Sequence, residues 1–415
     1  MKLLHFTDLH LGIESYGTLN PKTGLSTRVD DFLRSLDEVV DYAISEPVDA
    51  VLFAGDAFKN RDPNPTIQRF FAQRIRRLST AGIPTVLLIG NHDLPNNTAR
   101  ATAIDIYEAL EIPCVTVGRR IDCVRIETAS GPLQVVTLPW ISRSQLMTNE
   151  DMRQLSPDQI QMRMAEEISN ALRALTGELD RAVPAVLLAH TSVEGAKLGS
   201  EQSIMLGQEL VLGLDNLHVQ SFDYVALGHI HGYQVVHDQP PVVYAGSIER
   251  IDFGEEHEEK GFVTVEITTD ADGRRVAAPS FHPVHARPFH TLRIPAVSDD
   301  PMDDVRRTIE RRAADISGAI VRAFIKLPAE REDHVRLSEV RQLLLDAGAA
   351  YVGKVSTEVE TQARRQVEID ADEALDPVKM LERWLGQLDM APERRARILE
   401  EGKAIIRETG STRTE

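Results

Sequence analysis

Short apolar runs alternate with longer amphipathic segments along the first two thirds of the chain. The runs are rich in Val, Leu and Ile, as in strands buried within a sheet, and lie at residues 3–7, 50–54, 85–89, 135–138, 185–189, 224–227 and 242–245. Between them, apolar residues recur at spacings of three and four. In one such segment Pro65 stands just inside a predicted helix start and Gly82 just past its end. The pattern predicts a layered α/β domain over residues 1–268.

The pattern changes beyond residue 268. Residues 287–362 read as strand, helix, strand, helix, strand, which predicts a small α+β domain. Residues 376–410 then form two amphipathic helices after a polar linker, each with a proline at its first turn. Such a pair suits docking into a groove of a partner protein, and a hairpin folded back on the body fits equally well. The candidate partner-binding residues are Leu381, Trp384, Leu385 and Leu388.

Length and composition limit the possible classes. At 415 residues the chain is too long for one ordinary core, and 42% hydrophobic residues suffice for well-buried cores. The apolar runs are too short to span a membrane, and the N-terminus opens on a strand-like run with no signal pattern. Cys114 and Cys123 cannot build a disulfide framework, so a reducing cytoplasm is the expected location.

The formal charge of −18 argues against nonspecific coating of nucleic acids. It does not exclude DNA or RNA as a substrate, because bound cations reverse the local sign. One window, residues 59–77, is instead basic. Its Lys59 and Arg61 are candidate substrate-binding residues, while a solvated helix face is the simpler interpretation of the window as a whole.

Five strand-like runs are followed by side chains that bind metals. These are Asp8 and His10, Asp56, Asn91 with His92 and Asp93, His190, and His229 with His231. Ligands in open α/β sheets bind beyond the carboxyl ends of the strands, so the five positions should meet at one edge. A mixture of Asp, Asn and His suits a pair of divalent cations better than one structural zinc. Two such cations can hold the attacking and leaving oxygens of a phosphoryl transfer.

The order of these motifs resembles the calcineurin-like metallophosphoesterase superfamily. The resemblance implies a sandwich of sheets flanked by helices, with one metal held by Asp8, His10, Asp56 and His231. Asp56 would bridge to a second metal held by Asn91, His190 and His229. His92 would stabilise the phosphoryl group or act as a general acid, with Asp93 orienting it. The alternative is that His92 only supports a metal ligand.

Four further segments resemble SbcD-type nucleases, the bacterial relatives of the meiotic-recombination-eleven nuclease. They are residues 55–58, 228–231, 244–250 and 254–262. The resemblance implies a manganese-dependent DNA exonuclease and endonuclease of double-strand break repair, with magnesium as the possible substitute. It also implies a homodimer, a capping domain at 287–362 that shapes DNA access, and an SMC-like ATPase of the SbcC type bound by the C-terminal helices.

Two observations bear on these expectations. Lys59 stands where related nucleases often carry a histidine, and a lysine cannot shuttle protons near neutral pH unless its pKa is shifted, so the balance of exonuclease and endonuclease stays open. The chain also has no phosphate-loop motif, so any ATP dependence must come from another polypeptide. Two other functions fit the residues: a phosphodiesterase or phosphatase of small nucleotides, and a noncatalytic DNA-binding subunit.

Overall fold

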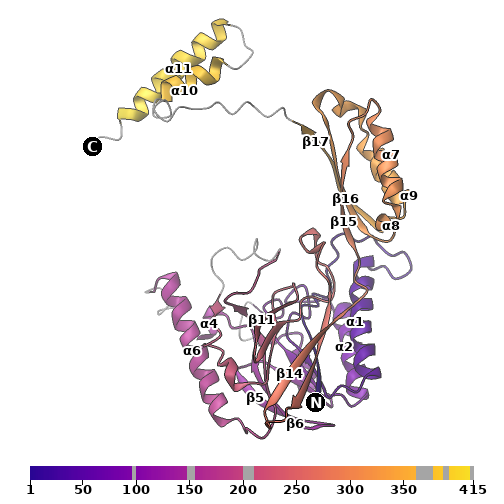
Figure 1. The fold of residues 1–415 in the computed structure, drawn as a ribbon, viewed down its shortest axis with the longest axis vertical. Helices are drawn as coiled ribbons and strands as arrows, with labels where there is room; N and C mark the ends of the chain where they lie inside the picture. The colour runs from indigo at the N-terminus through magenta and orange to yellow at the C-terminus, as the bar shows by residue number, and fades with distance from the viewer. Residues whose placement is uncertain (96–99, 147–154, 200–209, 361–376, 387–391, 412–415) are drawn as a thin grey trace. The chain divides into compact units, whose positions relative to one another are not determined.

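The computed structural model describes the chain except residues 96–99, 147–154, 200–209, 361–376, 387–391 and 412–415 (Figure 1). Contacts divide the chain into two units, Met1–Glu358 and Val359–Glu415. Among the described residues, none of the helices is both long enough and apolar enough to cross a membrane.

Two six-stranded sheets form the body of the first unit. The first has the order β14-β13-β1-β2-β3-β4, in which the last four strands are mutually parallel. The second has the order β11-β12-β10-β7-β6-β5, in which the four inner strands are parallel and both edge strands antiparallel. The bounds in the first sheet are Lys2–Phe6 for β1, Ala50–Phe53 for β2, Thr85–Leu88 for β3, Val115–Gly118 for β4, Gly261–Thr269 for β13 and Arg275–Pro283 for β14. Those in the second are Asp122–Thr128 for β5, Gly131–Leu138 for β6, Ala185–His190 for β7, Tyr224–Gly228 for β10, Gln234–Asp238 for β11 and Pro241–Tyr244 for β12.

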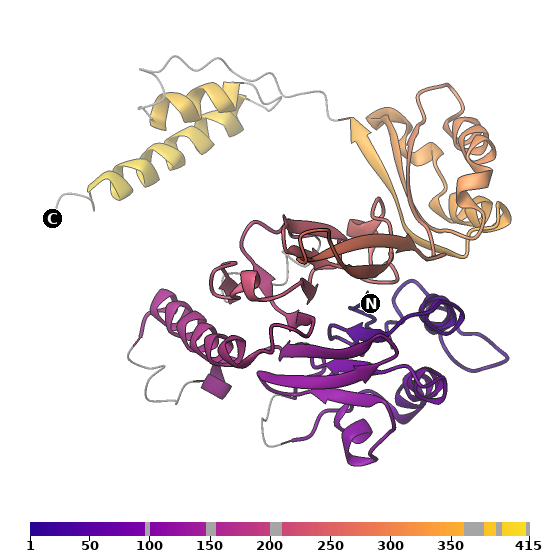
Figure 2. The same ribbon diagram turned by 60° about the horizontal axis from the view of Figure 1, so that its bottom comes forward.

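The two sheets pack face to face and helices cover their outer faces (Figure 2). Helices α1 (Thr27–Ser45) and α2 (Pro65–Thr80) lie on the first sheet, and α6 (Pro157–Glu178) lies on the second. The parallel strands are buried on both faces, which is why their sequences are continuous apolar runs. The predicted layered α/β fold with sheets flanked by helices is confirmed, and β14 continues the first sheet past residue 268.

The predicted start of α2 also has a local cause. Pro65 occupies the first turn, and the Asn64 side chain accepts hydrogen bonds from the backbone N–H groups of Thr66 and Ile67, both at 3.0 Å. The remaining short elements of the body are α3 (Asp105–Ala109), α4 (Arg143–Leu146), β8 (Ser192–Val193), β9 (Val211–Leu212), η2 (Val219–Ser221) and η3 (Phe253–Glu255).

A three-stranded sheet of order β15-β16-β17 follows the body. It belongs to the segment for which a capping domain is predicted, and we call it the cap. Its strands are Phe289–Pro295, Ile320–Pro328 and Tyr351–Glu360. Helices α7 (Pro301–Arg311) and α9 (Leu337–Asp346) pack on one face through an apolar core of their own. The short α8 (Ala313–Ile316) lies between α7 and β16, and η4 (Ala329–His334) lies between β16 and α9. The order of strands and helices is the one that the sequence predicts for residues 287–362.

The second unit contains α10 (Pro377–Gly386) and α11 (Pro392–Ser411), and the two helices contact each other. Lys403 and Glu382 form an ion pair at 2.8 Å, and the Leu381 side chain lies against Gly402. Leu385 is only 1% exposed, so in this conformation it does not offer an open surface to a partner. The side chain of Trp384 and the whole of Leu388 lie outside the described residues.

Candidate metal centre

The structure brings all seven predicted metal ligands to one edge of the sandwich. From the first sheet, Asp8 and His10 follow β1, Asp56 follows β2, and Asn91 follows β3. From the second sheet, His190 ends β7, and His229 and His231 follow β10. The carboxyl ends of parallel strands from both sheets therefore meet, as the position of the motifs predicts.

One group of donor atoms surrounds His10. Its Nε2 lies 3.1 Å from Nε2 of His231, 3.9 Å from Oδ1 of Asp8 and 3.7 Å from Oδ2 of Asp56. These side chains are largely buried, so water cannot easily satisfy them. The donor atoms of Asp8, His10 and His231 lie within 4.8 Å of one another, and Asp56 lies beside them, so this group could hold a cation.

A second group surrounds His190. Its Nε2 lies 3.0 Å from Oδ1 of Asn91 and 3.5 Å from Oδ2 of Asp56. The same oxygen of Asn91 is 3.1 Å from Nδ1 of His229. Because the Oδ2 atom of Asp56 is close to both His10 and His190, Asp56 stands between the two groups, where a bridging ligand would lie.

Hydrogen bonds behind the ligands orient two of the imidazoles. Nδ1 of His190 donates to the carbonyl of Ala54 at 2.6 Å, and Nδ1 of His231 donates to the carboxylate of Glu255 at 2.8 Å. When each ring is neutral, Nε2 faces the site with its lone pair, the arrangement typical of metal-binding histidines. The donor set therefore fits a pair of divalent cations.

The electrostatics of the site also favour bound cations. Burial alone would raise the pKa of Asp56, but His190 and His10 hold it far below its usual range. Burial alone would lower the pKa of His190, yet Asp56 and Asp8 raise it to about 9. Buried carboxylates thus create a negative potential that stabilises positive charge in their midst.

Two glycines allow the close approach of the ligand loops. A Cβ atom at Gly90 would lie 2.1 Å from Oδ1 of Asp56, and one at Gly228 would lie 2.3 Å from the carbonyl oxygen of Ala54. A side chain at Gly90 would displace the loop that carries Asp56, and one at Gly228 would push the ends of the two sheets apart. The ligands themselves have unusual backbones: φ is positive at Asp8, His10, Asp56 and His229, with values of 51°, 45°, 59° and 103°.

The predicted pairing of Asp93 with His92 is wrong. The buried Asp93 carboxylate accepts the backbone N–H groups of Asp56 at 2.9 Å and of Gly90 at 3.1 Å, so it fixes the loop that carries Asp56. His92 instead has its Nδ1 2.8 Å from the carbonyl oxygen of Lys59. The exposed His92 ring packs edge-on against His10, and its nitrogen lies near enough to Asp56 and His10 to join the first group.

The basic window is less positive than its sequence suggests. Arg74 and Arg77 of α2 form ion pairs with Asp37 and Asp41 of α1, including a contact of 2.6 Å between Arg74 and Asp37. The exposed Lys59 and Arg61 lie on the loop that follows Asp56. Their predicted role in substrate binding stays a prediction.

The sequence did not reveal two residues that contact the predicted metal ligands, Trp140 and Glu255. The Trp140 ring packs on the imidazole of His229, with ring centroids 4.9 Å apart, and Glu255 holds His231. Trp140 follows β6, which is parallel to β7, so its place after a strand was a usable signal. Glu255 follows the GSIER run, and no local pattern pairs it with a histidine 24 positions earlier.

Replacing Glu255 by glutamine should weaken divalent metal binding by about 10- to 100-fold, because the carboxylate orients His231 and raises its basicity. Lys260 and His231 hold the pKa of Glu255 at about 2 against the opposing effect of burial, so the wild-type group is ionised throughout the neutral range. Calorimetric titration with Mn²⁺ measures the change. Glu258→Gln is the control. Glu258 also binds Lys260, at 2.6 Å, whereas the imidazole of His231 is bound by Glu255.

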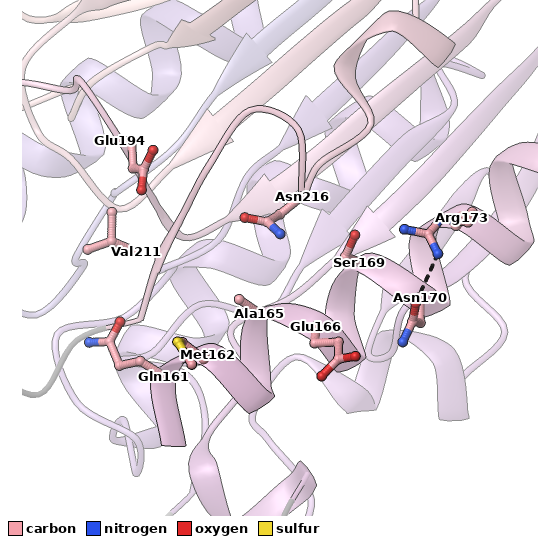
Figure 3. A pocket seen from close by; sticks show the side chains of 10 residues that line it. All are labelled: Gln161, Met162, Ala165, Glu166, Ser169, Asn170, Arg173, Glu194, Val211 and Asn216. Carbon is pink, nitrogen blue, oxygen red and sulfur yellow. Dashed lines mark hydrogen bonds between the residues drawn. The ribbon is translucent and has the colours of Figure 1, made fainter. Parts of the chain in front are cut away.

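A groove of about 560 Å³ lies elsewhere on the body (Figure 3). Residues of α6, among them Glu166 and Arg173, line one side, and Glu194, Val211 and Asn216 line the other. The groove contains none of the predicted site residues, and its charges are mixed. The metal-binding side chains gather at the strand ends and not in this groove.

Comparison with known proteins agrees with this geometry. The model of the calcineurin-like phosphoesterase family matches residues 1–233. The chain belongs to this family, which confirms the predicted class of enzyme, a metal-dependent phosphoester hydrolase.

Individual relatives narrow the similarity. The DNA double-strand break repair protein Mre11 of Aeropyrum pernix is 29% identical over 65% of this chain and 59% of its own length. This chain thus spans less than two thirds of the Aeropyrum protein. The protein of the same name from Haloferax volcanii is 28% identical over 90% of this chain and 70% of its own length. The SbcD component of the SbcCD nuclease of Rhodobacter capsulatus is 26% identical over 75% of this chain and 76% of its own length. The predicted resemblance to SbcD-type proteins is confirmed.

Proposed function

We propose that this chain is the nuclease subunit of a cytoplasmic SbcCD-type complex, which hydrolyses phosphodiester bonds of DNA ends or hairpins during double-strand break repair. The observation that carries the proposal is the convergence of seven donor side chains from five strand ends into two groups that share Asp56. The names of its relatives, Mre11 and the SbcD component of the SbcCD nuclease, support DNA as the substrate.

The side chains have separate tasks in this proposal. Asp8, His10, Asp56 and His231 would hold one Mn²⁺ or Mg²⁺, and Asn91, His190 and His229 with Asp56 would hold the other. When bound, the cations supply charge stabilisation to the phosphoryl oxygens. Asn91 ligates without adding charge, so the site does not become too anionic for a phosphate to approach.

His92 is placed to act on the substrate itself. The Lys59 carbonyl accepts a hydrogen bond from Nδ1–H of His92, so a second proton on the ring must sit on Nε2. In this imidazolium form Nε2–H can donate its proton to the leaving oxygen, and the ring is left neutral. Since His92 is exposed while its neighbours in the site are buried, it borders the side from which substrate arrives. Trp140 covers His229 and keeps water from that ligand.

One assay separates this proposal from its rivals. The purified chain is incubated with Mn²⁺ and linear duplex DNA, hairpin DNA or bis(p-nitrophenyl) phosphate. Cleavage of DNA as well as the small diester supports the nuclease. Hydrolysis of the small diester alone would favour a nucleotide phosphodiesterase, and no hydrolysis in the presence of bound metal would favour a noncatalytic DNA-binding subunit.

Deleting residues 376–415 should abolish binding to an SbcC-type ATPase while leaving manganese-dependent hydrolysis unchanged. The body and cap form a unit without these residues, and α10 and α11 form a separate pair. Co-purification with the ATPase and the assay above measure the two effects. Unaltered association of the shortened chain would contradict this role.

We also propose that the chain forms a homodimer, as the resemblance implies. Light scattering of both forms tests it, and a monomeric mass would contradict it.

A further inference from the structure

Arg287 lies in the connection between the body and the cap. Residues 284–288 have no regular secondary structure and join β14 of the body to β15 of the cap. The Arg287 side chain is 21% exposed, so most of it lies within the structure. It is therefore placed to act on how the two parts are joined.

On the body side, Arg287 binds two buried carboxylates. Its guanidinium forms a bidentate pair with Asp31 of α1, with Nε at 2.9 Å from Oδ2. Its backbone N–H lies 3.0 and 3.1 Å from the two carboxylate oxygens of Glu249. Bidentate contacts of this kind fix direction as well as distance, because the guanidinium is planar.

On the cap side, the same guanidinium donates from NH1 to the carbonyl oxygen of Gly318 at 2.8 Å. Gly318 lies two residues before the middle strand β16. A single side chain thus holds α1 of the body and the central strand of the cap. A second contact supports the same arrangement: the Tyr16 ring packs edge-on against Phe253 of the body and Phe289 of the cap, at 5.4 and 5.5 Å.

The body side of this connection reaches the metal ligands. Glu249 and Arg250 belong to the segment after β12, whose Ser247 donates its N–H to the carbonyl of His231 at 3.0 Å. Ser247 also forms a β-bridge with Thr7, the residue before Asp8. The Arg250 guanidinium in turn donates to the carbonyl of Arg287 at 3.2 Å. The cap is therefore tied to the strands that present the ligands.

We propose that Arg287 is a positioning residue that fixes the cap relative to the strand ends that present the metal ligands, and that it selects for long DNA substrates over small diesters. This inference rests on the proposed function. A duplex must contact both cap and body while its scissile phosphate reaches the ligands, whereas a small diester needs the ligands alone. A displaced cap then misplaces only the extended substrate.

Two variants and a matched control test the inference. Arg287→Ala should lower kcat/KM for duplex DNA by about 10²-fold and leave kcat for bis(p-nitrophenyl) phosphate within about twofold. Arg287→Lys keeps the positive charge but not the planar guanidinium, so its kcat/KM for duplex DNA should lie between those of the wild type and Arg287→Ala. Arg34→Ala is the control, because Arg34 also binds Asp31, at 2.7 Å, but within α1 and away from the cap. Asp31 keeps Arg28 at 2.8 Å in every variant, so the body should fold.

The outcomes distinguish this inference from the function on which it rests. Equal losses for DNA and the small diester in Arg287→Ala would make Arg287 a support of the metal site and overturn the inference, as would unchanged cleavage of DNA. If the wild-type protein hydrolyses only the small diester, the proposed function fails. The positioning role is then tested by amide hydrogen exchange in the cap strands, residues 289–295 and 320–328. Faster exchange in Arg287→Ala than in Arg34→Ala supports the positioning role, and equal exchange in the two variants overturns it.

Discussion

Replacing Asp56 by asparagine should lower the hydrolysis of bis(p-nitrophenyl) phosphate by about 10³-fold or more. Its Oδ2 lies between His10 and His190, so both donor groups share this carboxylate. Loss of its charge should remove several kcal/mol of stabilisation from the bound cations and from the transition state. Binding of Mn²⁺ should also fall below two ions per chain. Steady-state kinetics and metal analysis of the purified variant measure both effects.

Asp62→Asn is the matched control for this experiment. Asp62 is an exposed carboxylate on the same loop, so its replacement changes the net charge equally without touching the donor clusters. Its activity should stay near that of the wild type. A loss of less than about tenfold in Asp56→Asn would be too small for a bridging ligand and would contradict the two-metal assignment.

Replacing His92 by alanine should lower turnover by about 10²- to 10⁴-fold, the usual contribution of a general acid, while both metals stay bound. The Nδ1 contact with the Lys59 carbonyl leaves Nε2 of this exposed ring as the nitrogen that would act on the substrate in the proposed mechanism. Kinetics at saturating Mn²⁺ and calorimetric stoichiometry measure the two quantities.

The geometry provides a clear alternative for His92. Its nitrogen lies close enough to His10 and Asp56 to serve as a ligand. If His92→Ala loses a metal together with its activity, His92 is a ligand and not an acid. His334→Ala, which removes an exposed histidine of the cap, should change neither quantity.

The ligand positions were predictable because a simple rule governs them. Parallel strands of one sheet end at one edge, so the polar residues after β1, β2 and β3 must lie near each other, as must those after β7 and β10. The rule does not say that the two sheets pack with these edges together, which the structure shows. The layers followed from the same apolar runs, since a strand buried on both faces needs a partner layer on each. The two C-terminal helices followed from a proline at each start and an apolar stripe.

The remaining features depend on directions and distances that sequence does not contain. His92 and Asp93 are adjacent in sequence, yet one faces outward and the other turns back to the Asp56 loop, because a tight turn sends neighbouring side chains apart. Trp140 was missed because it is not a metal ligand by type. The pair of Asp31 and Arg287 joins residues 256 positions apart, and nothing local marks either one.

The left-handed backbones of the ligands have a consequence for engineering. Conformations of this kind cost on the order of 1–3 kcal/mol at each non-glycine residue, and Asp8, His10, Asp56 and His229 all adopt them. Their sum approaches the whole folding margin of an ordinary domain. Selection for heat resistance alone would therefore favour glycine at these four positions, because glycine relieves the backbone strain. The selected variants would lack the side chains that bind metal and would be inactive. A thermostable form of this enzyme has to be sought by screening activity first and melting temperature second.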